Sequence, residues 1–288
     1  ANGLSVSDSP LGYVDKGDAD KEEAFLALQA YLQGDEATDL LTGLGRRAGL
    51  IGLGTGGTDR SVWNPDWGID LERAIAPIPT PTAEVIGEAL RLYQSELRKP
   101  SLTVWVLDIS GSMEGEPIAQ LKQAMRLLLD PEAAAVNLLQ PSSRDVTIIL
   151  PFNHEPAGPT IVKGTAQEDL QRALTRVDRL DADGGTDLYR AIGAALGEME
   201  IFHLDGTLFD YLPAIVAMTD GASDDINRQW LLAQIDSTPF ARDVPIHSIA
   251  FGNADEAQLD ELSRLSIGRR FTAGDDLAGA LRKAKGYN

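Results

Sequence analysis

From residue 100 onward, short apolar runs alternate with longer segments in which apolar residues recur every three or four positions. The runs are rich in β-branched and aromatic residues, which is typical of strands, while the spaced pattern indicates helices with one buried face. Strands are predicted over 102–107, 146–151, 160–163, 211–219, 245–251 and 269–272, and helices from 116 onward and over 167–177, 186–199, 225–237, 254–265 and 275–285. Strands that alternate with helices imply an α/β fold, a doubly wound and mostly parallel sheet with helices on both faces.

The first hundred residues show a different, mostly helical pattern. Asp20 is a candidate cap for a helix over 21–33, and a second helix is expected over 36–44. Glycines within 49–58 match the spacing of a dinucleotide-binding loop, but a turn-forming run over 63–68 follows where that loop needs a helix, which excludes the match. Several prolines then precede a helical pattern over 82–98, so residues 76–99 are expected to form a Pro-rich connector and a helix.

The end of the strand predicted over 102–107 carries the clearest candidate chemistry. Asp108, Ser110 and Ser112 place one carboxylate and two hydroxyls on the loop at the carboxyl end of this strand, where open α/β sheets bind their ligands. Such a set suits a hard divalent cation, because Mg²⁺ prefers oxygen ligands and keeps several waters. The alternative for the two serines is capping of the helix that follows.

Two further motifs follow in order on predicted strand ends, Gly-Gly-Thr-Asp at 184–187 and Met-Thr-Asp-Gly at 218–221. Together with Asp-Ile-Ser-Gly-Ser-Met at 108–113, they make residues 100–288 resemble von Willebrand factor A domains that carry a metal-ion-dependent adhesion site. For Thr186 the alternative is a helix cap, and for Asp220 it is a plain turn.

The resemblance implies a bound Mg²⁺, with Mn²⁺ or Ca²⁺ as alternatives. It implies direct ligation by Ser110 and Ser112, ligation by Thr186 directly or through water, and mainly water-mediated contacts from Asp108 and Asp220. It also implies a protein partner that presents an Asp or Glu carboxylate as the last ligand. Subunits of ATPase-linked metal-insertion or chaperone-like complexes, metal-assisted hydrolases and purely structural roles remain open alternatives.

Composition narrows the classes of function. The 288 residues are 43% hydrophobic and 24% charged, as in ordinary globular proteins, and the net charge is −19. This charge argues against nucleic-acid partners, which require a basic face. There is no cysteine, and no apolar run approaches the length of a membrane-spanning helix. No nucleophile elbow or phosphate-binding loop is found, and the three histidines show no metal-ligand spacing, so we expect a binding module and not an enzyme.

A weaker resemblance concerns the segment before residue 100. Its Tyr-Val-Asp plus helix opening, the run Trp-Asn-Pro-Asp-Trp-Gly at 63–68 and the helix that ends in Lys99-Pro100 are similar to bacterial envelope proteins that fuse a solute-binding-like domain to a C-terminal A domain. On that resemblance residues 1–75 are the tail of an upstream domain and residues 100–288 are the A domain. The expected location is then extracellular or in the cell envelope.

Overall fold

The computed structural model describes residues 11–14, 17–46, 57, 59–68, 79–220, 223, 225–252, 254–272 and 276–285. The chain divides into two compact units, Ala1–Thr82 and Ala83–Asn288. Most of the glycine-rich stretch at 49–58 lies outside the described residues. Within the described residues no helix is long and apolar enough to cross a membrane.

The first unit contains the two helices expected from the sequence, α1 (Ala19–Leu32) and α2 (Asp35–Gly43), and a short 3₁₀ turn, η2 (Pro65–Trp67). The cap of α1 is Asp18, whose side chain accepts a hydrogen bond from the Lys21 backbone N–H, and not Asp20 as the sequence suggested. The buried Trp63 indole donates to the Thr42 carbonyl oxygen at 2.7 Å, which ties the turn to the end of α2.

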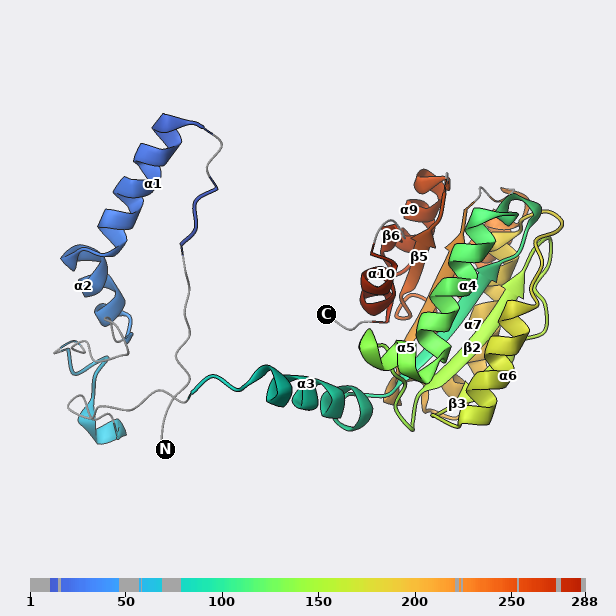
Figure 1. Ribbon diagram of the computed structural model, residues 1–288, viewed down its shortest axis with the longest axis horizontal. Coiled ribbons are helices and arrows are strands. Elements are labelled where there is room, and N and C mark those ends of the chain that lie inside the picture. The colour runs from blue at the N-terminus through green and yellow to red at the C-terminus, as the bar shows by residue number, and fades with distance from the viewer. Residues whose placement is uncertain are drawn as a thin grey trace. The chain divides into compact units, whose positions relative to one another are not determined.

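The second unit is built on a sheet of six strands in the order β3-β2-β1-β4-β5-β6 (Figure 1). Neighbouring strands are parallel except for β3, which pairs antiparallel with β2 at one edge. The predicted doubly wound α/β fold is therefore confirmed. The strands are β1 (Ser101–Asp108), β2 (Val146–Phe152), β3 (Thr160–Lys163), β4 (Leu212–Thr219), β5 (Ile246–Ala250) and β6 (Arg270–Thr272).

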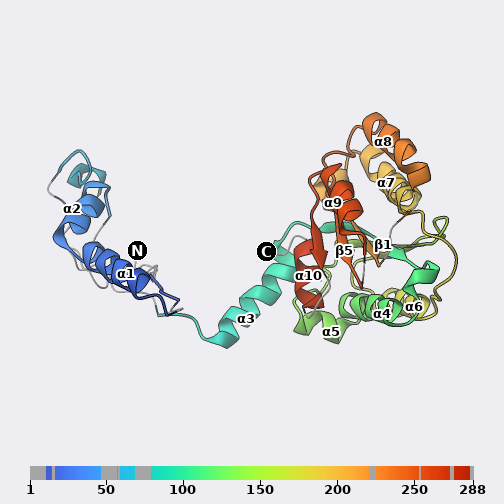
Figure 2. The same cartoon turned by 90° about the horizontal axis from the view of Figure 1, so that it is seen from above.

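Helices cover both faces of this sheet (Figure 2). Each face has its own buried apolar cluster. Every residue of β1 is buried, because its side chains alternate between the two clusters. One face is covered by α7 (Leu188–Leu204), α8 (Arg228–Ser237) and α9 (Glu256–Arg264). The other is covered by α4 (Glu116–Leu129), α5 (Pro131–Val136), α6 (Gln167–Asp178) and α10 (Leu277–Ala284).

Two elements differ from the sequence expectation. The helix expected over 82–98 is α3 (Ala83–Leu92), which continues as a π-helical stretch, η3 (Tyr93–Leu97). The short helix α5 was not expected, although its signals are in the sequence. Asp130 accepts hydrogen bonds from the N–H groups of Glu132 and Ala133, and Pro131 occupies the first turn, where its missing N–H costs nothing.

The strand order places β1 between β2 and β4, so the direction of winding changes between β1 and β4. In open parallel sheets the carboxyl ends of two such strands border a crevice in which ligands bind. Asp108 ends β1, and Asp220 follows the last residue of β4. The fold thus brings two of the candidate metal ligands to the same edge of the sheet.

Candidate metal site

Asp108 forms the buried base of the site. It has no exposed surface, and its two carboxylate oxygens accept hydrogen bonds from the Ser110 backbone N–H at 2.8 Å and from the Thr219 hydroxyl at 2.5 Å. Burial raises the pKa of Asp108, an effect that the nearby charge of Asp220 reinforces and the hydrogen bonds of Ser110 and Thr219 oppose. A carboxylate placed this way orients the first loop and adds negative charge beneath it.

The two serine hydroxyls and Asp220 form a continuous chain of oxygen atoms above Asp108. The Oγ atoms of Ser110 and Ser112 lie 3.1 Å apart, and Ser112 Oγ donates to Asp220 Oδ1 at 2.9 Å. The first and third motifs are therefore in contact, because they follow the neighbouring strands β1 and β4. Gly221, which completes the third motif, lies outside the described residues.

The second loop is held against the first by backbone hydrogen bonds. The Gly111 N–H donates to the Gly184 carbonyl oxygen at 2.9 Å, and the Asp183 N–H donates to the Ile109 carbonyl oxygen at 2.8 Å. A Cβ atom at Gly111 would lie 3.3 Å from the Gly184 oxygen, and Gly184 has a φ of +82°, so both glycines suit this close approach. The structure places Thr186 on this loop but gives its side chain no hydrogen bond to the other candidate ligands.

Three residues that the sequence did not single out connect these loops. Thr219 donates to Asp108, and Ser223 joins the second and third loops because its hydroxyl donates to the Thr186 carbonyl oxygen and accepts from the Leu188 N–H. The backbone carbonyl oxygen of Asn153, which follows β2, accepts from the Asp187 N–H at 2.8 Å. Thr219 lies inside the recognised Met-Thr-Asp-Gly motif, so its neighbourhood carried a signal, whereas Ser223 and Asn153 carried none.

Asp187 caps α7, a role considered for Thr186. Its side chain accepts from the Arg190 N–H at 3.0 Å, and α7 begins at Leu188 instead of residue 186. Asp187 also accepts a hydrogen bond from the Asn227 side chain. With Asp187 as the cap, the Thr186 hydroxyl is not needed to start the helix.

The donor set fits a hard divalent cation. Among the described residues no three His, Cys, Asp or Glu side chains gather as a metal site, so the set consists of hydroxyls with two carboxylates. The separations of 3.1 Å and 2.9 Å along the oxygen chain are those of hydrogen bonds, and the two serine Oγ atoms are about as close together as adjacent ligands of an octahedral Mg²⁺, which lie about 2.9 Å apart. Few charges and all-oxygen donors favour Mg²⁺ over Zn²⁺, which selects nitrogen and sulfur.

A mostly parallel, doubly wound sheet with helices on both faces defines the class of α/β domain to which the second unit belongs. The family model of the von Willebrand factor type A domain matches residues 103–270, and the chain belongs to this family. Its members are commonly used for metal-dependent protein binding or adhesion. No curated protein matches the chain.

Solved structures are similar to the chain at low sequence identity. The pilus adhesin SpaC from Lactobacillus rhamnosus GG is 13% identical with a TM-score of 0.50, covering 67% of this chain and 31% of that one. A von Willebrand factor type A protein from Catenulispora acidiphila is 15% identical with a TM-score of 0.49, covering 64% and 42%. Manganese-loaded TRAP from Plasmodium vivax is 20% identical with a TM-score of 0.46, covering 64% and 72%. The chain thus spans less than half the length of the first two.

Proposed function

We propose that the chain binds a protein ligand through a divalent cation, Mg²⁺ in the first place, at the carboxyl edge of β1 and β4. Asp108, Ser110, Ser112, Thr186 and Asp220 would hold the ion. The observation that carries this proposal is the chain of oxygen atoms from Ser110 through Ser112 to Asp220. The bound cation supplies a positive centre to which an Asp or Glu carboxylate of the partner can bind.

The protein's own residues prepare this position. Ser110 and Ser112 contribute neutral hydroxyls, so the ion keeps more of its positive charge than it would among carboxylates. Asp108 holds the first loop in place through the Ser110 N–H, while Thr219 fixes the other carboxylate oxygen. A chain with a net charge of −19 would otherwise repel an acidic ligand, so the ion also makes recognition of a carboxylate possible.

We further propose that the site binds and does not catalyse. A serine nucleophile needs a base within hydrogen-bond reach of its hydroxyl. In the described part of the chain, the side-chain hydrogen bonds of Ser110 and Ser112 run to each other and to the carboxylate of Asp220, which is proposed to hold the ion and which, as a carboxylate, is a weaker base than histidine. This arrangement supports the role of the hydroxyls as ligands.

The ion is tested first by thermal unfolding with and without MgCl₂ or MnCl₂. The wild type should melt at a higher temperature with either salt, because an ion that binds the native state stabilises it. Ser112→Ala should lose this increase. Ser143→Ala, which removes an exposed hydroxyl before β2, should keep it. An equal increase in both variants would remove Ser112 from the site.

The carboxylate is tested by water proton relaxation of the Mn²⁺-loaded protein. A capped Gly-Asp-Gly peptide should lower the relaxation enhancement because its carboxylate takes the place of a bound water. The matched Gly-Asn-Gly peptide, which has the same shape without the charge, should leave it unchanged. Equal effects of the two peptides would contradict carboxylate recognition and leave only metal binding.

A further inference from the structure

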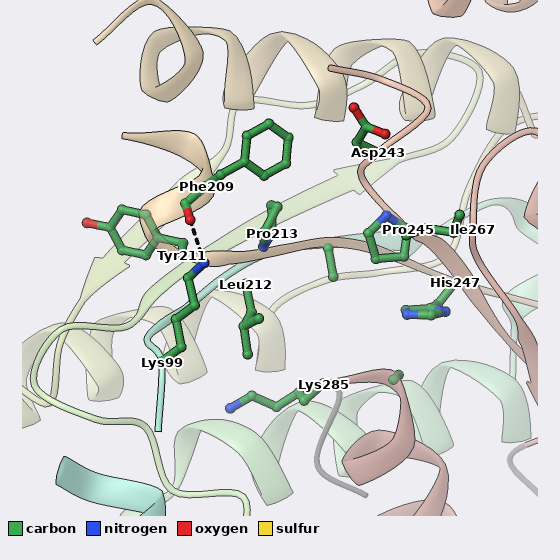
Figure 3. A pocket seen from close by; sticks show the side chains of 12 residues that line it. Lys99, Phe209, Tyr211, Leu212, Pro213, Asp243, Pro245, His247, Ile267 and Lys285 are labelled. Carbon is green, nitrogen blue, oxygen red and sulfur yellow. Dashed lines mark hydrogen bonds between the residues drawn. The ribbon is translucent and has the colours of Figure 1, made fainter. Parts of the chain in front are cut away.

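A cavity of about 340 Å³ lies at the amino ends of β4 and β5, at the end of the sheet opposite the metal loops (Figure 3). The residues preceding and beginning β4, the start of β5 and the last turn of α10 border it. Ligand pockets occupy about 300–1,000 Å³. The size of the cavity therefore suits a small molecule.

The wall of the cavity is largely apolar and partly open. Leu212, Pro213, Pro245 and Ile267 contribute to it, and Phe209 lies at its border. Phe209, Leu212 and Ile267 keep 48%, 43% and 68% of their surfaces exposed, although large apolar side chains are usually buried in a core. Exposed apolar side chains gathered around one cavity mark a binding site for an apolar group.

The polar groups in the lining are mostly hydrogen-bond donors. Lys99 Nζ donates to the Phe209 carbonyl oxygen at 2.5 Å, and an ammonium group has three donors in all. His247 Nδ1 accepts from the Arg269 N–H at 3.0 Å, and burial lowers the pKa of His247, so its neutral ring carries the hydrogen on Nε2. Asp243 is the acidic residue of the lining, and it is exposed.

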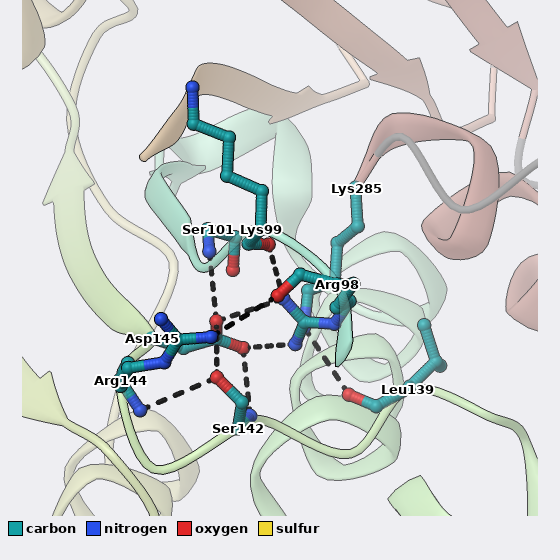
Figure 4. Close-up of polar contacts among 8 residues, drawn as sticks. All are labelled: Arg98, Lys99, Ser101, Leu139, Ser142, Arg144, Asp145 and Lys285. Atoms are coloured by element: carbon teal, nitrogen blue, oxygen red, sulfur yellow. Dashed lines mark hydrogen bonds and ion pairs between the residues drawn. The ribbon is translucent and has the colours of Figure 1, made fainter. Parts of the chain in front are cut away.

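Positive charge is concentrated beside the cavity. Figure 4 shows the basic residues Arg98, Arg144 and Lys285 near the carboxylate of Asp145, while the side chain of Lys99 points away from it. The buried Lys285 belongs both to this network and to the cavity lining, and its Nζ donates to the Leu139 carbonyl oxygen at 3.3 Å. Burial lowers the pKa of Lys285 to about 8, which leaves it largely protonated at pH 7.

The carboxylate of Asp145 is already engaged by other donors. It accepts hydrogen bonds from both terminal nitrogens of Arg98, from the N–H groups of Ser101 and Ser142, and from the Ser142 hydroxyl. The local excess of basic groups contrasts with the net charge of −19 of the whole chain. This end of the sheet is therefore complementary to an anion, while the cavity wall is complementary to an apolar body.

We propose that the cavity binds a small amphipathic monocarboxylate. Its apolar body would lie against Leu212, Pro213 and Ile267, and its carboxylate would face the exposed Lys99, with the buried charge of Lys285 behind the lining. This site is separate from the proposed metal site, because it lies at the other end of the sheet and uses none of the residues proposed to hold the ion.

The proposal is tested with octanoate in a ¹H–¹⁵N NMR titration of the full chain at pH 7 in excess EDTA, below the concentration at which octanoate forms micelles. The amide signals of Leu212, Ala214, His247 and Lys285 should shift together and saturate. Octan-1-ol and octylamine, which have the same apolar body, should bind about tenfold more weakly because they lack the charge-assisted hydrogen bond. Absence of saturable shifts, or equal affinity for octanoate and octan-1-ol, would overturn the proposal.

Paired variants locate the site. Ile267→Glu adds a negative charge at the cavity and should weaken octanoate binding at least threefold, because the repulsion between two exposed charges is about as large as the attraction in an exposed ion pair. Ile161→Glu, at an exposed isoleucine of the edge strand β3, should not change it. Lys99→Gln should also weaken binding, and its control is Lys163→Gln on β3. Equal affinities within each pair would place octanoate elsewhere and reject this cavity.

Discussion

Asp145→Ala should be one of the most destabilising single substitutions in the second unit. Asp145 and Arg98 form an ion pair whose side chains are only 1% and 3% exposed. Burial alone raises the pKa of Asp145, but Arg98, the charge of Lys285 and the N–H donors of Ser101 and Ser142 hold that pKa below its usual value. The carboxylate is therefore ionised at neutral pH, and its contribution to stability is lost only as the pH falls through this lowered pKa.

Alanine at position 145 would leave the Arg98 guanidinium buried without its carboxylate and would remove the acceptor of the Ser101 N–H. Loss of one partner of a buried ion pair costs about 3–5 kcal/mol. For a unit of this size, that corresponds to a decrease in Tm on the order of 10 °C. Urea unfolding at pH 7 measures the free energy directly.

The matched control is Asp178→Ala. Asp178 pairs with Arg126 at 2.8 Å, but their side chains are 38% and 56% exposed, so the loss should stay within about 1 kcal/mol. The double substitution Arg98→Met with Asp145→Leu should cost less than Asp145→Ala, since the Arg98 guanidinium is then no longer left buried without its carboxylate. If Asp145→Ala costs no more than Asp178→Ala, the assignment of the buried pair as a stabilising contact is wrong.

Three further predictions follow from the buried groups and the metal site. The folded state lowers the pKa of Lys285 from 10.5 to about 8, so the unfolded chain binds more protons between these pH values. The free energy of unfolding of the wild type, relative to that of Lys285→Met, should therefore rise by about 3 kcal/mol from pH 8 to 10.5. Urea unfolding that finds the same difference between the two proteins at both pH values would contradict this. Because the pKa of Asp108 is raised in the folded state, its ionised form costs stability, and this cost grows as the pH rises above 3.8 and is complete above the raised pKa. In EDTA at pH 7, Asp108→Asn should therefore be more stable than the wild type, but it should gain no stability from MgCl₂. A gain equal to that of the wild type would exclude Asp108 from the site. Removal of metal by EDTA should leave the far-UV circular dichroism spectrum unchanged, because the sheet has its own buried clusters on both faces; unfolding on chelation would instead make the ion structural.

The fold was predictable because the central strands of the second unit carry apolar runs and most of the helices on the sheet carry a buried apolar stripe. The metal edge was predictable for a related reason. Asp108 and Asp220 follow apolar strands directly, and the rule that parallel strands end at a common edge brought their loops together without knowledge of other contacts. What the pattern did not predict was the start of α7, where Asp187 competes with Thr186 for the same cap and only the backbone geometry decides between them.

Other features depend on residues that are distant in the sequence. The cavity joins Lys99, Leu212, His247, Ile267 and Lys285, which no local motif relates. The buried pair of Arg98 and Asp145 likewise forms only when the segment before β1 packs beside the start of β2. Ser223 belongs to the site because its hydroxyl lies between the second and third loops. No pattern in the sequence around this serine predicts that position.

The central claim is that a divalent cation binds between the first and third loops. An anomalous difference map from crystals grown with Mn²⁺ tests it most directly, because it locates the ion independently of any effect on stability. The account predicts a peak within coordination distance of the Ser110 and Ser112 Oγ atoms, near Asp108, Thr186 and Asp220, and loss of that peak in Ser112→Ala crystals. A peak at another acidic surface, with none at these serines, would contradict the account.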